Sequence, residues 1–477
     1  MSTPGFIQPG RNCWRVAQAD KFRSVQDAAD YFRLVRQAML AARHNVLILG
    51  WDILSSVDLV PGESPEDGPT HFGSLVDFIA RRNPELHVDI LIWNYSLLYT
   101  LERDPLSRVR LGWTTPSNVR FAYDDKIPVG GSHHQKVVVI DDQLAFCGGI
   151  DLTGHRWDTS AHNVDEPRRK SWAEHYCPYH EVQAMLSGPA AASLGELARD
   201  RWRAMGEEKI WPVAPAGEDL WPAGIEPDIT NARVAIARTL PGLENEPGVS
   251  ECEAMFEDSI ANAEHLIYIE SQYFTNAQLV QALAARLQEP AGPEVIVVSP
   301  EKCEGWLERN TMGAMRERAF RMLVASDPHG RLRILCPMAS QAQAVATFVH
   351  SKVTVVDDVH LRIGSANFSR RSMGVDSECD VAVDGADDPA VQDGIRRAFH
   401  RLLAEHLGMA ADEVTRGISQ AGTLREFIDS QSGADRTLVR IRIDLAEDGV
   451  PEIVQQVADP DEPIGGTNRH GDGAEFG

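Results

Sequence analysis

The sequence lacks the features that mark secreted, disulfide-bonded or membrane-spanning proteins. Its 477 residues include seven cysteines, an odd number without a C-x-x-C pair, so we expect mostly buried free thiols in a reducing compartment. Residues 1–24 contain no apolar leader, and no uninterrupted apolar run reaches the roughly 18 residues of a membrane-spanning helix. We therefore expect a cytoplasmic protein, with peripheral contact to any membrane.

Basic residues are also in deficit. The chain has 46 lysines and arginines against 70 acidic residues, a net charge of −24. Such a surface repels polyanions, so nucleic acid is not an expected partner. Hydrophobic residues make up 43% and charged residues 24%, which is ordinary for a soluble globular protein. The length predicts more than one domain.

The most informative feature is a pattern that occurs twice. The pattern H-x-K-x4-D is formed by His134, Lys136 and Asp141 and again by His350, Lys352 and Asp357. An offset of 216 residues superposes the two copies, and it also superposes Gly148 on Gly364 and Asp151 on Asn367. One such pattern would be weak evidence, but two copies with matched spacing indicate a duplicated functional unit.

Each copy alternates with the period of a strand and predicts a hairpin, with return strands at 144–149 and 360–365. The glycine-rich turn after each return strand places backbone N–H groups, and the Asn367 amide, beside the histidine and lysine. Cationic and neutral donors at short range suit a phosphate.

The rest of the chain shows two rounds of alternating strand and helix patterns, which predict mixed sheets with helices on their faces. We expect a helix at 24–43 and a strand at 45–51, with a long loop at 153–178 as a rim or lid of the site. The predicted units are an N-terminal lobe (1–205), a Pro-rich linker (206–230), a C-terminal lobe (231–410), an appendix (411–464) and a disordered tail (465–477).

These residues resemble the duplicated motif of the phospholipase D superfamily. Further similar segments are 148–152, 156–158, 179–183 with 188–189, and 267–274. They resemble the phospholipid-cleaving members more than the nucleases. The resemblance covers most of the chain and implies two similar α/β lobes, each a mixed β-sheet flanked by helices, related by a pseudo-twofold axis with one site between them. It implies no metal and no cofactor, and the 16 histidines form no H-E-x-x-H or Cys/His cluster.

A phosphodiester is anionic, so a neutral imidazole attacks it without the repulsion that a carboxylate would meet. One histidine should attack and the other should protonate the leaving alcohol. The resemblance assigns His134 as nucleophile and His350 as general acid and then base, although the repeat leaves the assignment reversible. Lys136 and Lys352 would neutralise the phosphate oxygens.

Other positions have supporting roles. Asn367, Ser365 and Gly149 are candidate phosphate ligands, and Glu378 and Glu181 are candidate carboxylates that orient the histidines, with Asp151 as a further supporting residue. The motif residues Asp141 and Asp357 are interpreted as structural residues of the turn and of the contact between the lobes.

We therefore expect a phospholipase D-like phosphodiesterase that cleaves the head-group phosphodiester of glycerophospholipids through a phosphohistidine, with water or an alcohol as acceptor. One monomer would suffice for the site. The nearest alternative is a cardiolipin synthase-like phosphatidyltransferase. A nuclease fits the charge less well, and a noncatalytic lipid-binding protein would not need both intact motifs.

Overall fold

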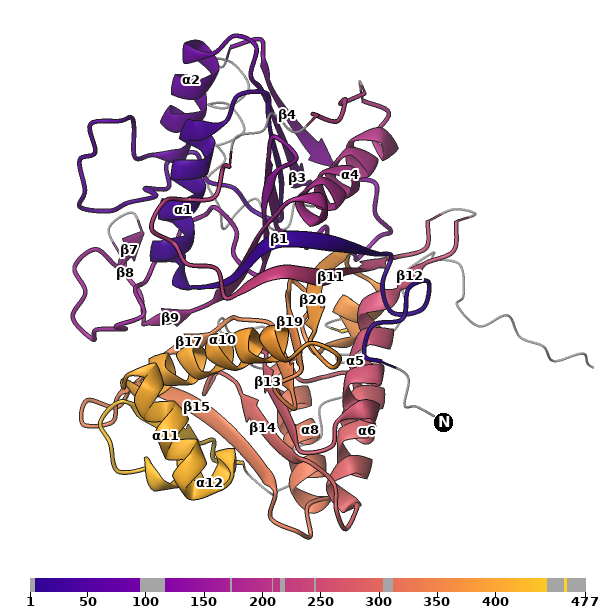
Figure 1. Cartoon of the computed structure of the whole chain (residues 1–477), viewed down its shortest axis with the longest axis vertical. Coiled ribbons are helices and arrows are strands. Elements are labelled where there is room, and N and C mark those ends of the chain that lie inside the picture. The colour runs from indigo at the N-terminus through magenta and orange to yellow at the C-terminus, as the bar shows by residue number, and fades with distance from the viewer. Residues whose placement is uncertain are drawn as a thin grey trace, which may run out of the picture.

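The computed structural model describes residues 5–94, 116–171, 174–207, 209–214, 219–243, 246–302, 312–443 and 459–460. It confirms an α/β fold. A large mixed sheet runs through the molecule from one end to the other, with helices on both sides (Figure 1). The predicted disordered tail and the end of the predicted appendix lie outside the described residues, apart from 459–460.

The strands of the two halves follow the same order. The first half contains, in spatial order, β4 (Val119–Asp124), β3 (His87–Trp93), β2 (Asn45–Gly50), β5 (Val137–Ile140), β6 (Leu144–Gly148), β10 (Val182–Ser187) and β1 (Arg15–Gln26). The second half contains β15 (Leu332–Ser340), β14 (Glu294–Val298), β13 (Leu266–Glu270), β18 (Val353–Val356), β19 (His360–Gly364), β20 (Glu378–Asp384) and β11 (Ile229–Leu240). The halves join where β1 pairs antiparallel with β11. An antiparallel pair of equivalent strands is what a twofold axis produces, although the axis itself stays a prediction.

The central strands are apolar because both of their faces are covered. In β2, Val46 and Ile48 belong to one core cluster, whereas Leu47 and Leu49 belong to another. The period of two thus sends alternate residues to opposite faces of the sheet.

Helices cover these faces. They are α1 (Asp27–Ala41), α2 (Phe72–Arg82) and α4 (Pro189–Ala204) in the first half, and α5 (Glu251–Asn262), α6 (Ala277–Gln288), α8 (Ala314–Ala325) and α10 (Pro389–Leu407) in the second. Helix α4 begins with the predicted proline, and α10 ends at Gly408, whose φ of +62° suits glycine.

The beginning and the end of the chain differ from expectation. Residues 24–26 belong to β1 rather than to a helix, because they pair antiparallel with residues 182–184 of β10. After α10, the chain forms α11 (Ala411–Ala421), α12 (Leu424–Ser430) and β21 (Thr437–Arg440). Strand β21 pairs with β15, so this segment extends the sheet of the second half.

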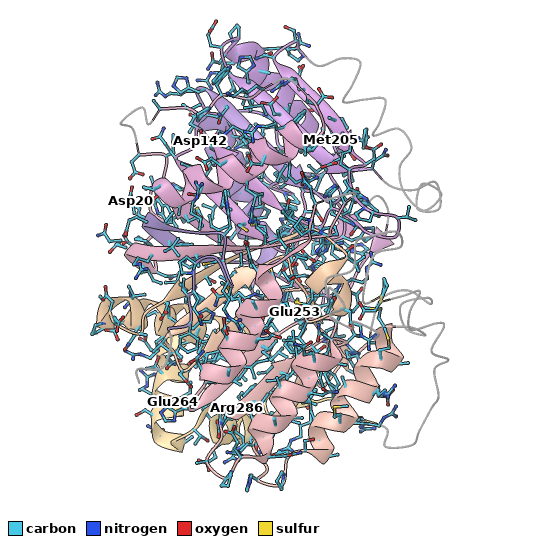
Figure 2. The ribbon with its side chains drawn as sticks, turned by 90° about the vertical axis from the view of Figure 1, so that its right-hand side faces the viewer. Asp20, Asp142, Met205, Glu253, Glu264 and Arg286 are labelled. Atoms are coloured by element: carbon cyan, nitrogen blue, oxygen red, sulfur yellow. The ribbon has the colours of Figure 1, made fainter. Side chains whose placement is uncertain are left out.

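Each of the two motif aspartates accepts hydrogen bonds from the backbone at the beginning of a strand in its own half, β2 for Asp141 and β13 for Asp357. Asp141 accepts hydrogen bonds from the backbone N–H groups of residues 43, 44 and 45 at 2.7–2.8 Å, and Asp357 accepts three from residues 264–266 at 2.6–2.7 Å. Figure 2 shows Asp142, next to the first aspartate, and Glu264, a partner of the second, in opposite halves. The expected role between the lobes was therefore wrong, and in the described part of the chain neither carboxylate is hydrogen-bonded to a histidine or lysine of the motifs.

We predict that Asp141→Asn lowers the free energy of unfolding by about 1–3 kcal/mol, because a buried charged acceptor of three N–H groups is lost. Asparagine tolerates the φ of +51° at this position, so backbone strain does not contribute. Urea unfolding measures the change, with the exposed Asp125→Asn as control. Equal stability of the two variants would contradict this role for Asp141.

Two further expectations concern composition. Of the described cysteines, five are buried and Cys177 is exposed, and all are free thiols, which confirms that most are buried and unpaired; Cys303 lies outside the described residues. In the described part of the chain, every helix is too short or too polar to cross a bilayer.

Candidate active site

Each motif histidine lies in an extended segment that pairs with the opposite half of the chain. The N–H of His134 donates to the carbonyl of Ser377 at 2.9 Å, and the N–H of His350 donates to the carbonyl of His180 at 3.0 Å. Both histidines precede the strands β5 and β18 rather than lying in them. Because Ser377 and His180 are followed directly by Glu378 and Glu181, this pairing brings one glutamate to each histidine.

The glutamates are exchanged between the halves. Nδ1 of His134 lies 2.9 Å from Oε2 of Glu378, and Nδ1 of His350 is hydrogen-bonded to Oε2 of Glu181. Both carboxylates are fully buried, whereas the histidine side chains are 16% and 11% exposed. Among the described residues, Nε2 of either histidine has no hydrogen-bond partner. A proton on Nδ1 that is donated to the carboxylate leaves the Nε2 lone pair available.

The two lysines lie beside the histidines in unequal surroundings. Nζ of Lys136 lies 3.0 Å from Oδ2 of Asp151. Nζ of Lys352 lies 3.0 Å from Nδ1 of His350 and 4.0 Å from Oε2 of Glu181.

The counterpart of Asp151 in the second half is the neutral Asn367, whose buried Oδ1 has no hydrogen-bond partner among the described residues. The second half therefore has no carboxylate at the position that pairs with Lys136 in the first.

Burial controls the protonation of these groups. It lowers the pKa of His134 and His350 well below the usual range, and the charges of the two lysines lower it further. Burial raises the pKa of Glu378 well above its usual range and also raises that of Glu181. Burial lowers the pKa of Lys352 to about 8. The imidazoles are thus neutral at neutral pH, as a nucleophile must be.

Two predicted phosphate ligands lie beside the glutamates. The hydroxyl of Ser365 is buried and donates to Oε2 of Glu378 at 2.5 Å. At the equivalent Gly149, a Cβ would lie 2.4 Å from Oε1 of Glu181, so only glycine leaves room for this carboxylate. Both residues shape the glutamate positions, and their binding of a phosphate stays a prediction.

Sequence reasoning missed the aromatic residues around the histidines. The ring of Trp51 lies 6.4 Å from that of His134, and the ring of Tyr179 lies 5.7 Å from that of His350. The Arg156 guanidinium lies over the Tyr179 ring, and its charge helps to lower the pKa of His350. The available signal was that Arg156 lies in the long loop 153–178, which was predicted to form a rim or lid of the site. A pocket shared by both histidines stays a prediction; two cavities in the described part of the molecule, of about 570 and 650 Å³, are lined by other residues.

The chain is similar to several known proteins. The family model described as "Cardiolipin synthase, PLD-like domain" matches residues 256–403. Phospholipase D A of Dictyostelium discoideum is 22% identical over 80% of this chain, and phospholipase D alpha 1 of Nicotiana tabacum is 23% identical over 78%. The chain spans 35% and 63% of the lengths of these two relatives.

Among solved structures, phosphatidylserine synthase of Haemophilus influenzae Rd KW20 has a similar fold. The TM-score is 0.54 at 12% identity, over 87% of this chain and 96% of that one. With the family match and the curated relatives, the duplicated motif identifies this chain as a member of the phospholipase D superfamily.

Proposed function

We propose that this protein is a phospholipase D-type enzyme that cleaves the head-group phosphodiester of glycerophospholipids through a covalent phosphohistidine. The observation that carries the proposal is the pair of histidines, each oriented through Nδ1 by a buried glutamate of the opposite half. A buried lysine lies beside each histidine. The named activities of the curated relatives support phospholipid as the substrate.

In the first step, Nε2 of His134 attacks phosphorus while the bond to the leaving alcohol breaks. His350 gives its proton to that alcohol. The anionic phosphate raises the pKa of His350 when it binds, because an opposite charge favours the imidazolium. Lys136 and Lys352 stabilise the negative charge on the non-bridging oxygens.

In the second step, His350 removes the proton from water or from an acceptor alcohol. The acceptor oxygen attacks phosphorus and the bond to His134 breaks. Hydrolysis and transfer therefore share one intermediate. A cardiolipin synthase-like transfer, in which the acceptor is the hydroxyl of another lipid, is the second candidate, because the matching family model carries that description.

Incubation with a panel of radiolabelled phospholipids, with and without a primary alcohol, tests the proposal. Without alcohol, we expect phosphatidic acid as the only lipid product. As the alcohol concentration rises, phosphatidyl alcohol should make up a growing fraction of the products. The His134→Asn protein, prepared in the same way, controls for contaminating activity. If the protein cleaves another phosphodiester but no phospholipid, glycerophospholipids are not its substrates.

We predict that kcat/KM falls as pH rises through about 8. Lys352 carries its charge below its pKa of about 8 and loses it above, so the phosphate then loses a cationic partner. Lys352→Arg should move this alkaline limb to higher pH, because arginine stays protonated. A pH–rate profile measures the shift, and Lys136→Arg is the matched control in which the limb stays in place. If the alkaline fall in kcat/KM stays at the same pH in Lys352→Arg, a group other than Lys352 causes it.

A further inference from the structure

Four side chains outside the catalytic set converge next to the site. They are Asp27 at the start of α1, His162 in the loop 153–178, His180 in β9 (Tyr179–His180) and Glu405 in α10. All four are buried, with exposures of 1%, 1%, 0% and 7%. One donor atom from each lies within 4.8 Å of the others. Two imidazoles and two carboxylates form a donor set for a divalent transition metal.

The separations of these atoms suit one ion. Glu405 Oε1 lies 2.6 Å from Nδ1 of His180 and 2.9 Å from Nε2 of His162. Asp27 Oδ1 lies 3.4 Å from Nδ1 of His180, and its Oδ2 lies 3.8 Å from Nε2 of His162. Donors arranged tetrahedrally at bond lengths of about 2.0–2.1 Å are roughly 3.3 Å apart. The observed values lie on both sides of that separation, so small side-chain shifts would complete the coordination.

The remaining nitrogen of each imidazole contacts a second carboxylate. Nδ1 of His162 lies 2.9 Å from Oδ2 of Asp158, and Nε2 of His180 lies 2.9 Å from Oε2 of Glu270. These carboxylates are buried as well. A carboxylate on the far nitrogen is the usual partner of a metal-bound histidine, because it fixes the tautomer and the ring orientation.

Two carboxylate oxygens of the cluster are unsatisfied. Asp27 Oδ2 and Glu405 Oε2 are buried and have no hydrogen-bond partner among the described residues. Asp27 Oδ2 faces the cluster, as its 3.8 Å separation from His162 shows. Buried charged oxygens without donors are costly, and a cation supplies what they lack. A cavity of about 570 Å³ reaches Glu405 beside Gln26 and Ser160, which provides an entry path for an ion.

We propose that Asp27, His162, His180 and Glu405 bind one divalent transition-metal ion such as Zn²⁺. Four protein ligands leave no open coordination position, so the ion has a structural role. It would join α1, the loop 153–178, β9 and α10, and so hold His180 in place. Glu181, which orients His350, is the next residue. The ion would therefore position part of the active site without contacting the substrate.

Metal analysis of the full-length protein tests this proposal without reference to any substrate. We expect about one zinc ion per chain after growth with zinc. Removal with a chelator should lower the melting temperature by about 5 °C or more, and added Zn²⁺ should restore it. His162→Gln and Asp27→Asn should each reduce the bound zinc at least about tenfold. His400→Gln, a buried histidine of α10 that bonds to Thr415 instead, should retain it.

Anomalous diffraction from the unaltered protein at the zinc edge locates the ion even if the variants fold poorly. A peak between the four side chains supports the proposal. A peak elsewhere, or zinc retained equally by His162→Gln, would overturn it. Protein that takes up neither zinc nor manganese, with an unchanged melting temperature, would also overturn it and would show that protons alone hold the cluster together.

Discussion

Replacement of His134 by asparagine should abolish formation of the covalent intermediate with every substrate and lower kcat on the order of 10⁴-fold or more, because the nucleophile is lost. His350→Asn should behave differently. It should slow the release of alkoxide leaving groups by about 10²–10⁴-fold, since these need a proton. A p-nitrophenyl ester needs little protonation, so the His350→Asn protein should release about one equivalent of nitrophenol and remain phosphorylated.

Mass spectrometry of the trapped His350→Asn protein decides the assignment. Phosphorus on the peptide that contains His134 supports it. An adduct found only at His350, in the reciprocal His134→Asn protein, would reverse the two roles. His265→Asn, whose side chain is 84% exposed, is a suitable control and should turn over both esters normally.

The second large effect should follow from removal of either orienting carboxylate. Glu378→Gln should lower the rate of phosphohistidine formation by about 10²–10⁴-fold with both leaving groups, because Glu378 orients the nucleophile His134. Glu181→Gln should impair alkyl esters far more than p-nitrophenyl esters, because Glu181 orients the acid His350. Single-turnover kinetics with both esters measure the two patterns.

This comparison tests the exchange of glutamates between the halves. If each glutamate served the histidine of its own half, the two patterns would be interchanged. Glu378→Asp and Glu181→Asp, which keep a carboxylate at each position, should recover part of the lost rate. Equal losses with both esters in both variants would contradict separate roles for the two histidines.

Much of the local structure could be predicted from the sequence. The short apolar segments of β5 and β18, and the offset of 216 residues, indicated both hairpins and the repeated order of elements, because neighbours along a strand are sufficient for such a prediction. Asp52 and Glu270 precede their histidines by 82 and 80 residues and suggest a pair, but Leu49 occupies the position of Glu270. The connecting segments differ in length, and strand register alone reveals this.

The pairing of strands that are distant in the sequence could not be predicted from the sequence. Strand β1 was read partly as the start of a helix, because nothing in its own sequence shows that β10 and β11 lie on its two sides. The same holds for β21, which completes the sheet beside β15 after more than 90 intervening residues.

By itself, the sequence indicated the candidate residues for the chemistry: two histidines and two lysines at matched spacing, and two glutamates as candidates to orient the histidines. Only the tertiary structure showed that Glu378 is hydrogen-bonded to His134 and Glu181 to His350. It also decided that Asp27, His162, His180 and Glu405 meet. The physical reason is that spacing along the chain encodes contacts within a strand or a hairpin. Contacts between the halves are made when β1 pairs with β11 and the side chains of both halves are buried together.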